Sequence, residues 1–256
     1  MADTGDTVGG LLKNLVAAAP TRPVLTCYDQ RTGERVELSG VTMDNWVAKT
    51  ANLLVDGCGL GEGDTAGVWL PPHWQTAAVL LGCWAAGLRV SFGAADDSCA
   101  AVAFAGTEMI EAAPGDLAAT APERFALGLA PLGRAMTTVP AGWVDYIVEV
   151  RGHGDRFGRA VAAGAAGWLS PDQQTVTQAQ LCARARQRAS ALGLPTGGRV
   201  LIDGAAHPSP ADWLLAPLSA GSSIVLVIGA DTGGTAESLA ALAEAERVDV
   251  TVAPAG

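Results

Sequence analysis

The chain has 256 residues, of which 49% are apolar and 16% are charged, and its formal net charge is −10. This composition supports a sizeable hydrophobic core and excludes an intrinsically disordered chain. The excess of acidic residues argues against nucleic acid or an anionic membrane surface as a partner.

The N-terminal residues MADTGDTVGG are acidic and lack the basic and apolar regions of a signal peptide. Apolar runs such as TAAVLLGCWAAGL are too short to span a bilayer. The five cysteines are odd in number, widely spaced and without a CxxC pair, which argues against a zinc site or a disulfide framework. These features predict a cytoplasmic protein without a metal site.

The first part of the chain predicts alternating helices and strands. Apolar residues alternate with polar ones on both sides of the QRTGE turn, which is typical of a β-hairpin. Helical spacing of apolar residues surrounds this hairpin on both sides. In chain order we expect a helix at 8–19, the hairpin at 23–29 and 35–40, a helix at 42–60, a strand at 65–70, a helix at 73–87 and a strand at 88–92.

The middle, residues 93–150, is harder to interpret. It predicts strands at 100–106 and 145–150, and a helix at 121–136 that Pro131 breaks.

The last part predicts the same kinds of element again. Thr175 or Thr177 is able to cap the first of these helices. We expect a helix at 175–194, a strand at 198–203, a helix at 209–221, a strand at 222–229, a helix at 235–248 and a strand at 249–254.

Two stretches of the chain align at a constant offset. Gly59 and Gly193, His73 and His207, and Gly87 and Gly221 each differ by 134 in number. Two α-β-α-β units of this kind favour parallel strands. The predicted fold is therefore α/β, with two similar sub-sheets flanked by helices. The predicted regions are an N-terminal helix or tail (1–24), a first α/β half (25–150), a loop region (151–174) and a second α/β half (175–256).

The segment GLGEGDTAGVWLPPHWQTAAVLLGCWAAGLRVSF, preceded by the hairpin and a helix, resembles the acyl-adenylate-forming superfamily of AMP-binding enzymes. GLPTGGRVLIDGAAHPSPADWLLAPLSAGSSIVLV is similar to the segment that follows the phosphate loop in that family. The resemblance covers about residues 25–256 and implies the N-terminal part of such an enzyme. In that family, adenine-binding motifs, a hinge and a small domain with a catalytic lysine follow, and we expect this chain to lack them.

The segment EVRGHGDRFGRAVAAGAAGWLSPDQQ, residues 149–174, falls where the family carries its phosphate loop. The family loop is rich in Ser, Thr and Gly and ends in Pro-Lys-Gly, because backbone N–H groups, hydroxyls and an ammonium group bind the phosphates. Here the segment contains no lysine, and the two lysines of the chain, Lys13 and Lys49, lie far upstream. The loop is therefore interpreted as degenerate, and we expect no catalytic residue in this chain.

Four side chains are candidates for binding a ligand. Arg151, His153 and Arg156 form a basic cluster, and arginine can bind a phosphate or a carboxylate with two hydrogen bonds. The alternative is a solvated loop, or one fastened to the domain by an arginine–carboxylate pair. His207 follows a predicted strand, where open α/β sheets bind ligands, and it matches a position that is often His or aromatic near the acyl pocket of the family. The glycines of GADTGGTAES, 229–238, are interpreted as a plain strand-to-helix loop.

The sequence thus predicts a non-catalytic relative of the AMP-binding acyl-CoA synthetases that serves as a ligand-binding or regulatory module. The ligand is expected to be a small acyl or nucleotide compound, with ATP or AMP as an open alternative. A homo-oligomer or a protein partner would cover the sheet edge expected near residue 250. The alternatives are an active AMP-forming acid–thiol ligase, alone or as half of a split enzyme, and an interaction module without a small ligand.

Overall fold

The structure is a computed structural model that describes residues 6–92, 100–112, 121–169, 175–229 and 235–252. The chain forms two compact units that interleave along the sequence. Unit 1 comprises residues 1–44, 72–77 and 182–256, and unit 2 comprises residues 45–71 and 78–181. Among the described residues, no helix is long and apolar enough to cross a membrane.

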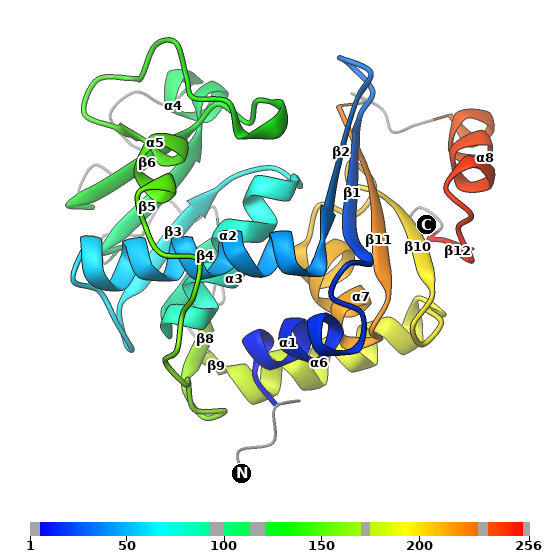
Figure 1. The fold of residues 1–256 in the computed structure, drawn as a ribbon, viewed down its shortest axis with the longest axis horizontal. Helices are drawn as coiled ribbons and strands as arrows, with labels where there is room; N and C mark the ends of the chain where they lie inside the picture. Colours follow the sequence, from blue (N-terminus) through cyan, green and yellow to red (C-terminus); the bar gives the residue numbers. More distant parts are fainter. Residues whose placement is uncertain (1–5, 93–99, 113–120, 170–174, 230–234, 253–256) are drawn as a thin grey trace. The chain divides into compact units, whose positions relative to one another are not determined.

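The described elements follow in chain order (Figure 1). The helices are α1 (Val8–Ala18), α2 (Gly40–Asn52), α3 (Trp74–Ala86), α4 (Thr107–Ala112), α5 (Tyr146–Arg151), α6 (Gln178–Ala191), α7 (Ala216–Ser219) and α8 (Ala236–Ala245), with π-helical turns η1 (Leu53–Gly57) and η3 (Ala211–Leu215) and the 3-10 turn η2 (Pro131–Gly133). The strands are β1 (Pro23–Asp29), β2 (Glu34–Ser39), β3 (Thr65–Trp69), β4 (Arg89–Phe92), β5 (Val102–Gly106), β6 (Glu123–Leu127), β7 (Val144–Asp145), β8 (Ala166–Leu169), β9 (Thr175–Thr177), β10 (Arg199–Asp203), β11 (Ser223–Ile228) and β12 (Val250–Thr251).

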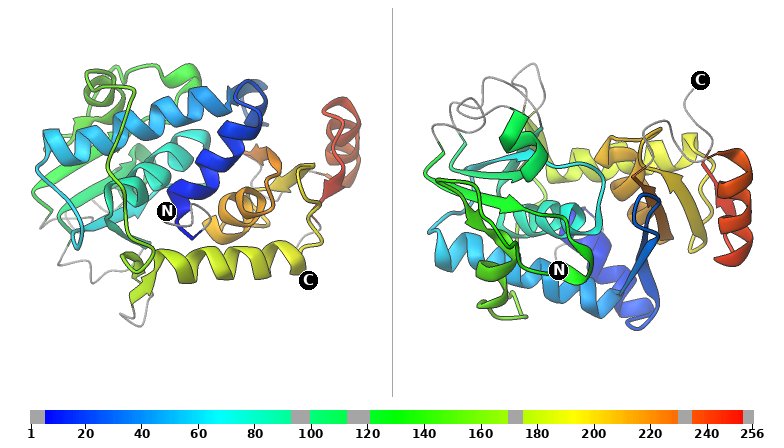
Figure 2. Two further views of the ribbon diagram at one scale, coloured as in Figure 1. Left: turned by 60° about the horizontal axis from the view of Figure 1, so that its bottom comes forward. Right: turned by 90° about the horizontal axis from the view of Figure 1, so that it is seen from above.

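Unit 1 contains a sheet of order β12-β10-β11-β1-β2, in which only the β1–β2 pair of the described strands is antiparallel. Helix α8 stands along one face of this sheet (Figure 2). Its half-buried residues Leu239 and Leu242 pack on Leu201, Val225 and Val227. The long-range pairing of β1 with β11 places the N-terminal hairpin in the sheet built by the second half of the sequence.

Unit 2 contains a sheet of order β7-β6-β5-β3-β4-β8-β9, in which the described strands are parallel except for the β8–β9 hairpin. Helices α2 and α3 approach closely, because a side chain at Gly82 would meet Thr50 at 2.5 Å. The Thr50 and Tyr146 hydroxyls share a buried hydrogen bond of 2.7 Å. The ring of Tyr146 lies edge-on to Phe104 of the sheet. The core of unit 2 thus joins α2, α3 and α5 to one face of its sheet.

The predicted repeat is confirmed in the local geometry of the two sheets. Thr65 pairs with Arg89 in unit 2, and Arg199 pairs with Ser223 in unit 1, so both strand pairs differ by 134 residues. The left-handed glycines correspond as well, with φ of +70° at Gly59 and +65° at Gly193. Glycine is the residue that adopts this conformation without steric cost, which explains the signal in the sequence. The α/β fold with two similar sheets is therefore confirmed.

Two predicted elements of the middle region are wrong, whereas the predicted strand at 100–106 is confirmed as β5. Residues 145–150 form helix α5 rather than a strand, because the Asp145 carboxylate accepts the N–H of Ile147 and caps the helix. Residues 121–136 contain β6 and η2 rather than a helix. The buried Phe125 and Leu127 place β6 inside the sheet, between β5 and β7, where pairing overrides local preference.

The predicted helix at 175–194 begins later than expected, since residues 175–177 form β9. Thr177 still caps α6: its hydroxyl accepts the N–H of Gln180, and the Gln180 side chain accepts the N–H of Thr177. The remaining predicted helices and strands lie close to their predicted positions where they are described. Parts of the predicted loop at 229–238 and of the predicted strand at 249–254, residues 230–234 and 253–254, lie outside the described residues.

Candidate functional site

Asp29 and Asp203 lie at the carboxyl ends of the parallel strands β1 and β10 in unit 1, with β11 between them. Asp203 is 5% exposed, and its carboxylate accepts the N–H of Ala205 at 2.9 Å. Asp29 accepts the N–H of Arg31 at 2.8 Å. A side chain at Gly229 would lie 2.3 Å from the Asp29 carboxylate, so only glycine fits beside it. In open α/β sheets this is the end at which ligands bind.

His73 lies in the part of unit 1 formed by residues 72–77 and is 6% exposed. Its Nδ1 accepts the N–H of Gln75 at 3.2 Å, at the start of α3. Burial lowers the pKa of His73 to about 4, although the negative charge of Asp29 acts to raise it. His73 is therefore a neutral imidazole at pH 7 and has the structural role of a helix cap.

His207 is 2% exposed and follows β10, with its N–H bonded to the carbonyl of Asp203 at 2.9 Å. Its Nδ1 lies 3.7 Å from the Asp212 carboxylate. Asp212 in turn binds the Arg188 guanidinium with two hydrogen bonds of 2.6 and 3.1 Å. Asp212 belongs to η3, and π-helical turns are frequent at functional sites. His207 is thus fixed at the carboxyl end of the sheet as the sequence predicts.

This end of the sheet can bind a ligand through hydrogen bonds but offers little positive charge. Asp29 and Asp203 are carboxylates, and His73 is neutral because burial depresses its pKa. Arg31 is exposed at 59% of its side chain and lies 3.7 Å from Asp29. Stabilising the charge of a phosphoryl transition state needs cationic donors aimed at it. The sequence predicts His207 here but not the two aspartates, whose only signal is their place after strands.

The structure places the basic cluster of the predicted loop in unit 2, after the C-terminal end of α5. Arg151 is the last residue of α5, and its guanidinium donates to the carbonyl of Gly133 at 2.8 Å. His153 is half-buried, and its ring packs closely on Gly57. A Cβ atom added at Gly57 would lie 3.1 Å from this ring. Arg156 is exposed, and its guanidinium has no hydrogen bond or ion pair among the described residues. Arg151 and His153 thus have structural contacts, and Arg156 remains accessible to solvent.

Carbonyls of this loop accept hydrogen bonds from side chains of α2. The Lys49 ammonium donates to the carbonyl of His153 at 2.6 Å, and the Asn52 amide donates to the carbonyls of Gly154 and Arg156 at 2.8 and 3.0 Å. The loop also follows the C-terminal end of a helix, which carries partial negative charge. A bound phosphate needs N–H donors and the positive end of a helix. Carbonyls of residues 153–156 are thus used in contacts with α2, and residues 170–174 of the predicted loop lie outside the described residues.

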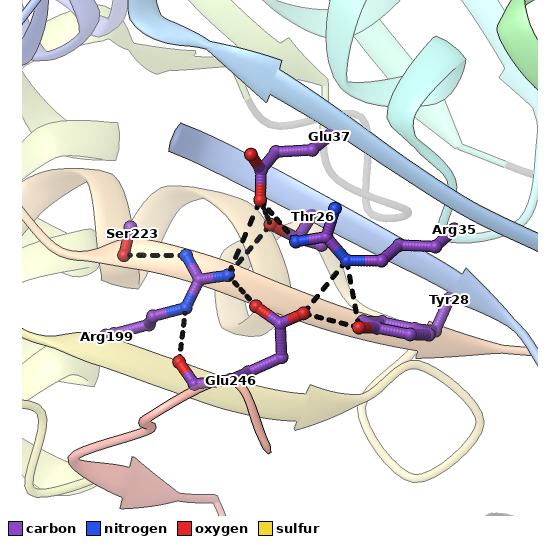
Figure 3. Close-up of polar contacts among 7 residues, drawn as sticks. All are labelled: Thr26, Tyr28, Arg35, Glu37, Arg199, Ser223 and Glu246. Atoms are coloured by element: carbon purple, nitrogen blue, oxygen red, sulfur yellow. Dashed lines mark hydrogen bonds and ion pairs between the residues drawn. The ribbon is translucent and has the colours of Figure 1, made fainter. Parts of the chain in front are cut away.

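A second group of charged side chains lies on the sheet face of unit 1 that α8 partly covers (Figure 3). It comprises Thr26, Tyr28, Arg35, Glu37, Arg199, Ser223 and Glu246, which come from β1, β2, β10, β11 and the end of α8. Glu246 receives hydrogen bonds from Tyr28, Arg35 and Arg199. Arg35 also donates to Glu37, and Arg199 donates to Thr26 at 3.0 Å.

The cluster links the end of α8 to the sheet of unit 1 and is not an open anion-binding site. Burial acts to raise the pKa of Glu246, but hydrogen bonds from Arg35, Tyr28 and Arg199 outweigh it and lower this pKa to about 2. The two arginines and two glutamates balance in charge, and their donors and acceptors face one another. The sequence could not reveal this cluster, because its members span residues 26 to 246 without a common motif.

Comparisons with solved structures identify the fold. The Brucella canis acyl-CoA synthetase aligns with a TM-score of 0.74 and 18% identity, over 94% of this chain and 46% of that one. The anthranilate CoA ligase AuaEII in complex with anthranoyl-AMP aligns with a TM-score of 0.72 and 14% identity, over 96% of this chain and 49% of that one. The N-terminal domain of FACL13 from Mycobacterium tuberculosis aligns with a TM-score of 0.67 and 14% identity, over 96% of this chain and 62% of that one.

The chain therefore has the fold of the N-terminal part of adenylate-forming enzymes, and it spans about half the length of the two full ligases above. No model of a known protein family matches the sequence. A protein of Mycobacterium tuberculosis strain H37Rv, described as a TIGR03089 family protein, is 40% identical over 227 residues, which are 87% of this chain and 90% of that protein. On this similarity the chain belongs to the TIGR03089 family.

Proposed function

We infer that this protein is a non-catalytic relative of the adenylate-forming enzymes that binds a small acyl or nucleotide ligand as a regulatory or carrier module. One observation carries the proposal: the carbonyls of His153, Gly154 and Arg156 accept hydrogen bonds from Lys49 and Asn52. These contacts hold the loop to α2, and the segment 149–174 contains no lysine that would offset phosphate charge. Lys49, one of two lysines in the chain, is used in this contact.

The ligand site of this proposal is the carboxyl end of the unit 1 sheet, around His207. Its buried imidazole lies 3.7 Å from the Asp212 carboxylate, which is bonded to Arg188. Such a site can recognise an acyl carbonyl, a ribose or a base by hydrogen bonds without catalysing adenylation. Arg156 is the other candidate that has a free guanidinium among the described residues.

Two measurements test the proposal. In an ATP–pyrophosphate exchange assay with a panel of carboxylic acids, we expect no turnover above the protein-free blank. In a thermal-shift screen with AMP, ATP and acyl-CoAs, a ligand at about 100 times its Kd should stabilise the protein by about 2.7 kcal/mol. We expect His207→Ala to abolish the shift and Arg156→Ala to retain it. Exchange activity in the wild type would refute the non-catalytic assignment.

The alternative is half of a split ligase, which the span of 46% and 49% of the solved ligases favours. A second chain would then supply the remaining domain with its lysine. Copurification of such a chain, together with exchange activity of the pair only, would establish this alternative in place of the binding module.

Self-association is a separate part of the proposal. The two-residue strand β12 lies at one edge of the unit 1 sheet in the described residues. Edge strands carry open backbone groups that can pair with another chain. Gel filtration coupled to light scattering should show a dimer, and a strict monomer at high concentration would argue against it.

A further inference from the structure

A cavity of about 250 Å³ opens at the amino end of the unit 1 sheet. Helices α1 and α7 contact each other (Figure 1), and both contribute residues to the lining of the cavity. The turn that leads into β1 contributes Arg22 to its lining. Since β1, β10 and β11 are parallel, this cavity is at the opposite end of the sheet from His207.

The floor of the cavity is aliphatic. Leu11 and Leu15 of α1 are each 6% exposed, and Leu218 of α7 is 3% exposed. Small residues such as Ala18 line the opening and leave the space between the helices unfilled. An apolar chain of a ligand in this cavity would cover the parts of these leucine side chains that are still exposed.

Arg22 supplies a fixed positive charge at this cavity. Its Nη2 donates to the carbonyls of Gly197 and Gly198 at 2.7 and 3.1 Å, which holds the plane of the guanidinium in place. A guanidinium has five N–H donors, and these are its only bonds within the described part of the chain. The remaining donors are available to a carboxylate.

The carbonyls at the end of α7 do not compete for these donors. Those of Ala216, Pro217 and Leu218 already accept backbone N–H groups at 3.0 to 3.1 Å. The partial negative charge of this helix end is thereby reduced near the cavity. Among the described lining residues, Arg22 is the one charged side chain.

We propose that this cavity binds a short aliphatic monocarboxylate, with the carboxylate on Arg22 and the chain on the three leucines. A volume of about 250 Å³ holds about eight non-hydrogen atoms at roughly 30 Å³ each. Hexanoate has this number of atoms. The site is independent of the ligand proposed at His207.

Ligand-observed NMR titration of the full-length chain with sodium hexanoate tests the proposal. We expect saturable binding with a Kd on the order of 1 mM, which suits a ligand of this size. Hexanol has the same chain without the charge and should bind at least tenfold more weakly. This comparison uses the wild type and does not depend on any variant folding.

Two matched variants locate the site. Ala18→Phe fills the cavity and should weaken hexanoate binding at least tenfold. Ala17→Phe is its control, because Ala17 is exposed on the same helix and does not line the cavity. No saturable binding in the wild type, equal binding of hexanol, or wild-type affinity of Ala18→Phe would each overturn the proposal.

Discussion

The contact between α2 and α3 in unit 2 provides the sharpest test of the packing. An added methyl at Gly82 would lie 2.5 Å from both Cβ and Cγ2 of Thr50. Thr50 cannot move aside easily, because its hydroxyl bonds the carbonyl of Trp46 at 2.8 Å and the hydroxyl of Tyr146 at 2.7 Å. Both Thr50 and Gly82 are fully enclosed by the core. Gly82→Ala should therefore force the helices apart.

The expected cost combines two destabilising contributions and one stabilising contribution. Overpacking a well-packed core costs about 1–3 kcal/mol, and loss of the Thr50–Tyr146 hydrogen bond adds about 1 kcal/mol. The better helix propensity of alanine returns about 1 kcal/mol. Gly82→Ala should thus reduce the free energy of unfolding by about 1–3 kcal/mol.

Gly9→Ala is the matched control. Gly9 lies in α1, and no atom is within 4 Å of the position that its Cβ would take. The same substitution should therefore raise stability there, by about 0.5–1 kcal/mol. Urea unfolding followed by circular dichroism measures both values. If both variants shift stability in the same direction, or if Gly82→Ala is neutral, the close approach of the helices is wrong.

The other predictions concern charged and buried polar groups. The pKa of His73 in the folded state is about 4, below its ordinary value of 6.5. The stability that neutral His73 contributes is therefore complete above pH 6.5 and is lost as pH falls toward 4. In urea unfolding, His73→Gln should remove about 3 kcal/mol of the change in stability between these two pH values. Glu246→Gln should lower the free energy of unfolding by about 2 kcal/mol at pH 7. Because the pKa of Glu246 in the folded state is about 2, the difference in stability between the variant and the wild type should shrink as pH falls from 4.5 toward 2. Lys49→Met should speed hydrogen exchange in residues 152–159 and lower the free energy of unfolding by about 1 kcal/mol. Lys13→Met changes an exposed residue and should alter the free energy of unfolding by no more than about 0.5 kcal/mol. Equal hydrogen exchange in both lysine variants would contradict the role of Lys49.

The candidate site was predictable only where local chemistry marks it. His207 stands out because it follows a strand and matches His73 at an offset of 134, and the structure places it at the carboxyl end of β10. The basic cluster stands out for its composition, yet the role of its loop depends on Lys49 and Asn52, about a hundred residues earlier. A sequence pattern does not show whether a loop offers its N–H groups or its carbonyls.

The sequence alone determined the order of helices and strands over most of the chain, because apolar spacing and glycine turns act over a few residues. It also determined the repeat, since Gly59 and Gly193 each need a left-handed backbone at the same point of the unit. Only the tertiary structure decided that β1 pairs with β11 and that Glu246 meets Arg35 and Arg199. Those contacts join residues up to about two hundred positions apart, and their energy depends on burial and geometry that arise after the chain has folded.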